Sequence, residues 1–365
     1  MPSERFQNAL RRAPQAVPPI WLMRQAGRYH HHYRALRERH SFLELCRNPE
    51  LAAQVALGPV LEFDFDVAIL FSDLLFPLEA LGMSLSYEES GPVLSPKLEE
   101  ARLGRLRPVE DALPRLEFQR DAMRATREVI PRDKSVIGFV GGPWTLFVYA
   151  MEGSHKGDLI RSKTSAELYR AFADRLVPLL IENVRLQLEG GAEVVMVFDT
   201  AAGELSPAWF HRVVAGDLAA MFGAFPGRLG YYARGIQPAH LRESRSSDDG
   251  GAQEPRRRAP SPDPRNGRWT DCAGIGVDWR WDLREALRQG SEIGFVQGNF
   301  DPALLFLPPE EFREQLRLYL DPLVALPIEA RSGWICGLGH GVLPRTPEEN
   351  VATFVRTVRE VFHES

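Results

Sequence analysis

The 365-residue sequence contains few lysines, only three cysteines and no long hydrophobic run. No stretch approaches the roughly 18 consecutive apolar residues that indicate a membrane-spanning helix, so we expect no membrane segment. The cysteines Cys46, Cys272 and Cys336 are odd in number and far apart, which indicates a reducing compartment and not a disulfide framework. The first twelve residues, MPSERFQNALRR, lack the apolar core of a signal peptide. We therefore expect a cytoplasmic protein.

Other absences limit the choice of ligands. The net charge of -5 and the pI near 6.0 argue against a dedicated nucleic-acid-binding protein. The sequence contains neither a G-x-G-x-x-G turn nor a P-loop. Only four lysines occur, and none has the apolar surroundings typical of a Schiff-base lysine. We expect no cofactor.

Eight short apolar runs are spaced along the chain, and most are separated by segments long enough for a helix. This alternation is typical of parallel strands joined by right-handed crossover connections. It predicts a (β/α)8 TIM barrel that forms a single domain over residues 1–365, with an N-terminal extension before the first strand. An open doubly wound sheet is the competing fold, but its glycine-rich phosphate turn is missing. The runs are 20–23, 67–71, 136–140, 194–198, 228–232, 273–277, 293–297 and 334–336.

The segments between these runs carry further expectations. The apolar spacing predicts helices over 3–12, 36–45, 49–60, 110–130 and 168–189. The glycines and prolines between residue 74 and about residue 107 predict an irregular segment. Residues 243–267 are rich in Ser, Pro, Gly, Asp and Arg and have almost nothing to bury. We expect them to form a mobile surface insertion.

In such a barrel, the residues that follow the strands gather at one face and build the site. Arg24 and Arg28 follow the first run, and Gly27 between them permits a tight bend close to a ligand. The planar guanidinium fork matches carboxylate or phosphate oxygens, so this segment predicts a polyanion-binding site. An arginine-capped strand followed by a helix start explains the same pattern without a ligand.

Asp73 and His340 are candidates for chemistry at the same face. Asp73 follows an almost wholly apolar run and is either a helix cap or an acceptor for N–H groups of a ligand. Burial without a partner raises the pKa of such a carboxyl, whereas Arg24 and Arg28 nearby would keep it ionised. His340 lies between glycines after the last run, a pattern that favours close approach to a ligand. Thr200 follows another run and either donates to a ligand or caps a helix.

The sequence offers two weak metal-ligand patterns. Cys336 and His340 lack further ligands at zinc-like spacing. The run His30-His31-His32 is ambiguous, and we expect exposed histidines there. We predict no metal site.

Six motifs, taken together, resemble the uroporphyrinogen decarboxylase family over nearly the whole chain outside residues 243–267. They are PPIWLMRQAGRY, ILFSDLL, IGFVGGPWTLFVYAMEG, VFDTAAGEL, QGNFDP and LGHGVLP. The resemblance implies a cofactor-free (β/α)8 barrel, usually a homodimer, with a deep cleft at the carboxyl end of the strands. It also implies decarboxylation of the four acetate side chains of uroporphyrinogen III to give coproporphyrinogen III in haem and tetrapyrrole biosynthesis.

The same resemblance assigns roles to individual residues. Arg24 and Arg28, with the backbone between them, would bind substrate carboxylates. Asp73 would accept hydrogen bonds from pyrrole N–H groups and stabilise a cationic intermediate. The family often has serine where Thr200 stands, and the hydroxyl is kept. The implied catalytic residues are Arg24, Arg28, Asp73, Tyr149 and His340, and the implied substrate-binding residues add Gln25, Ala26, Gly27, Phe71, Ser72, Phe139, Gly141, Phe198 and Thr200.

Two alternatives remain open at this point. A cobalamin-dependent methyltransferase of the same superfamily would hold zinc with His and Cys near the barrel mouth, and here the last run leads to LGHG without an H-x-C pair. A non-catalytic protein that binds tetrapyrroles would need the same cationic site.

Overall fold

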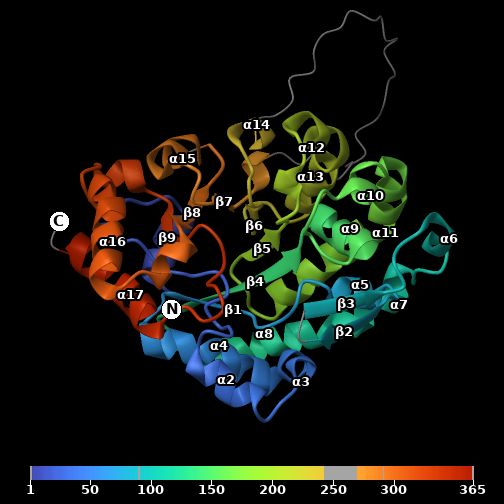
Figure 1. Ribbon diagram of the computed structural model, residues 1–365, viewed down its shortest axis with the longest axis horizontal. Coiled ribbons are helices and arrows are strands. Elements are labelled where there is room, and N and C mark those ends of the chain that lie inside the picture. Colours follow the sequence, from blue (N-terminus) through green and yellow to red (C-terminus); the bar gives the residue numbers. More distant parts are fainter. Residues whose placement is uncertain (1, 89–90, 242–268, 291, 364–365) are drawn as a thin grey trace, which may run out of the picture.

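Seven parallel strands form one curled sheet at the centre of the protein, with helices around it (Figure 1). The computed structural model describes residues 2–88, 91–241, 269–290 and 292–363. Neighbouring strands in the sheet follow one another in the sequence, with no exchange of order. The strands are β1 (Val67–Ile69), β4 (Ser135–Gly141), β5 (Val195–Phe198), β6 (Leu229–Tyr232), β7 (Gly274–Gly276), β8 (Phe295–Phe300) and β9 (Trp334–Leu338).

The first apolar run lies between the two edges of this sheet and joins them. Ile20 forms a parallel bridge with Cys336 of β9, and the Trp21 amide donates to the Cys336 carbonyl oxygen at 3.1 Å. On the other side, the Asp66 amide donates to the Ile20 carbonyl oxygen at 3.1 Å. The segment thus completes the ring, and the predicted barrel architecture is confirmed.

The barrel interior is filled by large apolar side chains, as expected for a small closed sheet. Helix α1 (Glu4–Leu10) packs against this interior through Phe6 and Ala9. Ser3 caps this helix, because its hydroxyl accepts from the Phe6 amide at 3.4 Å. The buried interior set includes Trp21, Met23, Val67, Ile69, Ile137, Met196, Phe198, Tyr232, Phe295 and Ile335.

The remaining helices surround the sheet (Figure 1). Between the closing segment and β4 in the chain, they are α2 (His31–Arg37), α3 (Phe42–Arg47), α4 (Pro49–Phe63), α5 (Phe76–Ala80), α6 (Glu100–Leu103), α7 (Val109–Ala112) and α8 (Glu117–Val129). Those that follow are α9 (Pro143–Glu152), α10 (Ile160–Lys163), α11 (Ala166–Glu189), α12 (Pro207–Val213), α13 (Ala215–Ala224), α14 (Pro238–Leu241), α15 (Leu283–Gly290), α16 (Pro309–Val324) and α17 (Glu348–His363). Among the described residues, no helix combines the length and the apolar character needed to cross a membrane.

Two local expectations are wrong. The predicted helix over 36–45 is split, because Ser41 and Glu44 form a reciprocal capping box that begins α3. The segment expected to be irregular contains an antiparallel hairpin of β2 (Ser84–Glu88) and β3 (Gly91–Ser95). Alternating buried Leu85 and exposed neighbours mark β2, but the surrounding glycines and prolines hide this pattern in the sequence. The insertion predicted at 243–267 lies outside the described residues.

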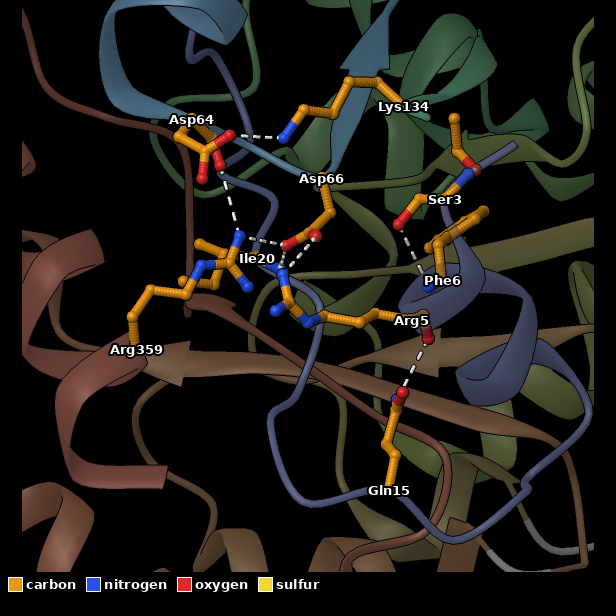
Figure 2. A network of polar contacts seen from close by, with 10 residues as sticks. Ser3, Arg5, Phe6, Gln15, Ile20, Asp64, Asp66, Lys134 and Arg359 are labelled. Carbon is orange, nitrogen blue, oxygen red and sulfur yellow. Dashed lines mark hydrogen bonds and ion pairs between the residues drawn. The ribbon is translucent and has the colours of Figure 1, made fainter. Parts of the chain in front are cut away.

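A buried carboxylate supports the closure of the barrel (Figure 2). Asp66 precedes β1, and its Oδ2 accepts from the Ile20 amide at 2.7 Å. Arg359 of α17 donates to the same oxygen at 2.6 Å, and Arg5 of α1 donates to Oδ1 at 3.4 Å. One side chain therefore ties the closing segment to the first and last helices.

Replacing this carboxylate tests the closure. We expect Asp66→Asn to lose about 2–4 kcal/mol of unfolding free energy, because it leaves the largely buried Arg359 guanidinium without its anion. The urea midpoint measures the loss. Asp64→Asn is the matched control, since Asp64 has a 70% exposed side chain and pairs with Lys134 at the surface. An equal shift in both variants would contradict the role of Asp66.

Candidate active site

A cavity of about 830 Å3 opens at the carboxyl end of the barrel beside β1. The residues after the closing segment, the residues after β1, helices α2 and α9 and the β2–β3 hairpin contribute to its wall. Its lining includes Arg24, Ala26, Gly27, Arg28, Tyr33, Arg34, Arg37, Phe42, Phe71, Ser72, Asp73, Leu74, Tyr87, Tyr149 and Val342.

The turn over residues 24–28, here called the arginine turn, presents two unpaired cations to this cavity. Neither the Arg24 nor the Arg28 guanidinium forms a hydrogen bond or a salt bridge within the described parts of the chain. Arg24 has a left-handed backbone (φ 63°), which is uncommon for a residue with a Cβ and is typical of functional sites. A Cβ at Gly27 would lie 2.9 Å from the Arg24 carbonyl oxygen, so the turn requires glycine there.

The side chain of Gln25 points away from the cavity and holds the arginine turn in place. It is fully buried, donates to the Val67 carbonyl oxygen at 2.9 Å and accepts from the Leu22 amide at 3.3 Å. The Tyr29 hydroxyl donates to the Gln25 carbonyl oxygen at 2.8 Å. The turn is therefore fixed from beneath, which leaves its arginines free to meet a ligand.

Asp73 faces the cavity from the loop after β1. Its Oδ1 accepts from the Leu75 amide at 2.8 Å, so it does act as a local cap. Burial raises the pKa of its carboxyl, and the Leu75 amide, the Tyr87 hydroxyl and the charge of Arg24 only partly oppose this. The arginines therefore offset burial less than expected from the sequence. The Ser72 hydroxyl beside it is buried and has no hydrogen-bond partner within the described residues.

An aromatic row crosses the barrel near this cavity. The rings of Phe139 and Phe198 lie 5.7 Å apart, and Phe198 meets Tyr232 edge-on at 6.2 Å. Tyr232 stacks on His340 at 5.8 Å, and its hydroxyl lies 3.1 Å from His340 Nδ1. Phe139 of β4 and Phe198 of β5 thus belong to the barrel interior. Through Tyr232 they form a continuous row of ring contacts that ends at His340.

His340 is held as a neutral imidazole. Burial and the positive charges of Arg24 and Arg234 lower its pKa to about 3. Glycine is needed at position 341 for steric reasons, because a methyl group on Gly341 would collide with the Arg24 side chain. The last loop and the arginine turn are therefore in direct contact.

Tyr149 of α9 reaches the cavity with its hydroxyl oriented by a second histidine. Its oxygen lies 2.8 Å from His155 Nδ1. Burial raises the pKa of Tyr149 and, together with Arg24 and Arg234, lowers that of His155. Tyr149 is thus a neutral phenol at ordinary pH.

The residues expected at the site fall into two groups. Those in the cavity wall are Arg24, Ala26, Gly27, Arg28, Phe71, Ser72, Asp73 and Tyr149. Those outside that wall are Gln25, Phe139, Gly141, Phe198, Thr200 and His340. Of the second group, Thr200 directly follows the buried Asp199 at the end of β5, and Gly141 ends β4.

Several residues that lie near the cavity were not identified from the sequence. Arg234 follows β6 and stacks on Trp279 at 5.5 Å. The rule that selects Arg24 from the end of its strand also selects Arg234, and the sequence signal was therefore available. Tyr87 and His155 carry no such signal, because one comes from the unexpected hairpin and the other from the loop after α9.

The described residues contain one potential metal-binding group. One group of at least three His, Cys, Asp or Glu side chains is close enough to hold an ion, and it consists of His30, His31, Glu62 and Glu348. It includes neither Cys336 nor His340. Cys336 is fully buried in β9, and burial raises the pKa of its thiol.

The fold and the cavity together define an α/β-barrel protein in which two arginines share a cavity with the carboxylate of Asp73. The chain belongs to the uroporphyrinogen decarboxylase (URO-D) family, whose sequence profile matches residues 1–248 and 259–361. Uroporphyrinogen decarboxylase of Chloroflexus aggregans is 36% identical over 98% of this chain and 95% of its own length. The enzyme of the same name from Pelobacter propionicus is 34% identical over 98% of both chains.

A solved methyltransferase structure has the same fold. A methyltransferase from Methanosarcina mazei superimposes with a TM-score of 0.70 over 98% of both chains, at 17% sequence identity. At this identity the similarity concerns the fold alone.

The lowered pKa of His340 predicts a pH-dependent cost in stability. Between pH 6.5 and about 3 the unfolded chain protonates this histidine and the folded protein does not, so protons favour unfolding. We expect wild type to lose about 1 kcal/mol more per pH unit than His340→Gln between pH 6 and pH 5. Urea denaturation at both pH values measures this difference. Parallel losses in the two proteins would contradict a neutral, buried His340.

Proposed function

We propose that this protein removes carbon dioxide from the four acetate side chains of uroporphyrinogen III and releases coproporphyrinogen III. One observation carries the proposal: the unpaired Arg24 and Arg28 share a cavity with the carboxylate of Asp73. A porphyrinogen has carboxylates at its periphery and N–H donors at its centre. Arginines beside the carboxylate of Asp73 are therefore the complement of this substrate.

The reaction needs an electron sink, and the substrate supplies it. Protonation of a pyrrole ring carbon gives an iminium cation. The bond between the acetate methylene and its carboxylate then breaks, carbon dioxide leaves, and the electron pair neutralises the iminium. A proton adds to the resulting methylene group, and the ring carbon loses a proton. Each acetate becomes a methyl group with a net uptake of one proton.

Asp73 stabilises the positive charge of the iminium cation that forms during these reaction steps. The pyrrole N–H groups donate to its carboxylate and replace the water that burial removes, which favours the ionised form. Its negative charge then stabilises the iminium cation, an effect that is large because the site is already organised. The two arginines bind the carboxylates that are not reacting. The hydroxyl of Tyr149 supplies a polar contact at the cavity wall. We expect Thr200 and the neutral His340, which lie outside that wall, to contact the substrate where it extends beyond the cavity.

The family resemblance extends the proposal to a cytoplasmic homodimer, and sedimentation velocity tests the dimer. The alternative function, a cobalamin-dependent methyltransferase, would need His and Cys ligands for zinc at the barrel mouth. Within the described residues, Cys336 and His340 join no metal-binding group. Incubation with uroporphyrinogen, followed by chromatography of the oxidised products, tests the activity. Porphyrins with seven to four carboxyl groups support decarboxylation, and unchanged octacarboxylate would support mere binding.

Removing the charge of Asp73 separates its catalytic role from a structural one. We expect Asp73→Asn to lose at least about 100-fold in kcat, because the iminium cation loses its partner. We expect its thermal stability to equal or exceed that of wild type, because burial raises the carboxyl pKa and ionisation therefore costs stability at neutral pH. Assays and melting curves measure both effects.

Asp301 provides the matched control. It follows β8, and its Oδ1 accepts from the Ala303 amide at 2.9 Å in the same local arrangement, outside the cavity wall. Asp301→Asn should keep wild-type kcat. Wild-type kcat in Asp73→Asn would refute the role of Asp73.

Arg28→Gln tests the carboxylate-binding role of the arginine turn. We expect its KM to rise about 10- to 100-fold, since a hydrogen bond to a charged group contributes about 1.5–3 kcal/mol. Arg313→Gln on α16, which removes a surface partner of Glu310, should leave KM unchanged. Steady-state kinetics measures both, and equal KM values would exclude Arg28 from substrate binding.

A further inference from the structure

Four potential metal ligands meet on the outside of the barrel, next to the arginine turn. His30 precedes α2, His31 begins it, Glu62 lies in the last turn of α4, and Glu348 begins α17. None of the four lines the cavity. The expectation of exposed histidines in this run is wrong for His30, whose side chain is 0% exposed, whereas the His31 side chain is 60% exposed.

The ligand atoms lie close to the separations that a tetrahedral ion requires. His30 Nε2 lies 2.7 Å from Glu62 Oε2, which lies 3.6 Å from His31 Nδ1. His31 Nδ1 lies 2.6 Å from Glu348 Oε2, and all four atoms are within 4.8 Å of one another. Zinc bonds of about 2.0–2.1 Å to nitrogen and oxygen place neighbouring ligands about 3.4 Å apart in a tetrahedron. Small side-chain movements would therefore suffice.

Charge and ligand type indicate which ion fits. Two carboxylates carry two negative charges, and two neutral imidazoles add none, so a divalent cation gives a neutral centre. Imidazole nitrogen is a ligand for zinc and similar transition metals, whereas magnesium and calcium prefer oxygen alone.

The cluster is held in place by groups that an ion would not displace. The buried His30 ring contacts Phe63 of α4 at 5.3 Å, and its Nδ1 has no partner in the described residues, so its polar contact is made through Nε2. Glu348 keeps its second oxygen engaged, because Oε1 accepts from the His31 amide at 2.8 Å and from Arg34 at 3.1 Å. Its Oε2 remains directed at the cluster.

We propose that His30, His31, Glu62 and Glu348 form a binding site for a divalent transition metal of the zinc type. Metal bonds would replace the hydrogen-bonding protons between these side chains and would join the start of α2 to α4 and α17. Because His30 follows Arg28 by two residues, the ion would also anchor the end of the arginine turn. The proposal does not depend on the proposed function.

Metal binding is measured on full-length protein purified without a histidine tag. After dialysis against Zn2+ and removal of free metal, we expect one zinc per chain by elemental analysis. X-ray absorption should show nitrogen and oxygen at about 2.0 Å, with imidazole scattering. Loading should raise the melting temperature by about 3–5 °C at saturating zinc. Magnesium at the same concentration should produce neither effect.

Substitutions assign the site. His31→Gln and Glu62→Gln change exposed side chains, and we expect each to weaken zinc binding at least about tenfold in competition titrations. His32→Gln is the matched control, because His32 belongs to the same run but its Nε2 contacts the Gln54 carbonyl oxygen at 2.9 Å. Wild-type affinity in His31→Gln and Glu62→Gln, no zinc retained by wild type, or an equal response to magnesium would each overturn the proposal.

Discussion

The closure of the barrel by residues 19–21 is the constraint on which the rest of the structure depends. These residues bond to β9 on one side and, through Ile20 and Asp66, to the start of β1 on the other. Backbone bonds on the β1 side are few, so the Asp66 and Gln25 side chains complete the pairing. The arginine turn follows directly. Its position over the barrel mouth is therefore a consequence of how the sheet closes.

The candidate active site holds charged and ionisable side chains at a cost in stability. Arg24 and Arg28 form no salt bridge in the described residues, and Arg24 also adopts a left-handed backbone. Burial raises the pKa of Asp73 and lowers that of His340, so each group is less easily charged than in water. A substrate with many carboxylates and central N–H donors would relieve these costs. This is the physical sense in which the cavity and the proposed substrate are complementary.

The loops at the barrel mouth contact one another, so the position of a side chain in one loop depends on residues in another. Gly341 makes room for the Arg24 side chain, and the aromatic row connects β4 and β5 to His340 through Tyr232. His155 orients the Tyr149 hydroxyl from the loop after α9. A substitution in one of these loops will therefore also shift side chains in the loops that it contacts.

The sequence by itself determined the order of strands and the residues that end them. Each apolar run became a strand or the closing segment, because parallel strands buried on both faces need continuous apolar stretches. From this order alone, Arg24, Arg28 and Asp73 could be placed at one face. Only the tertiary structure decided what depends on contacts between distant segments. It buried Gln25 beneath the turn, formed the hairpin that carries Tyr87, and brought Glu62 and Glu348 to His30 and His31. Local patterns encode which residues are apolar, whereas these pairings depend on how the closed sheet positions helices that lie far apart in the chain.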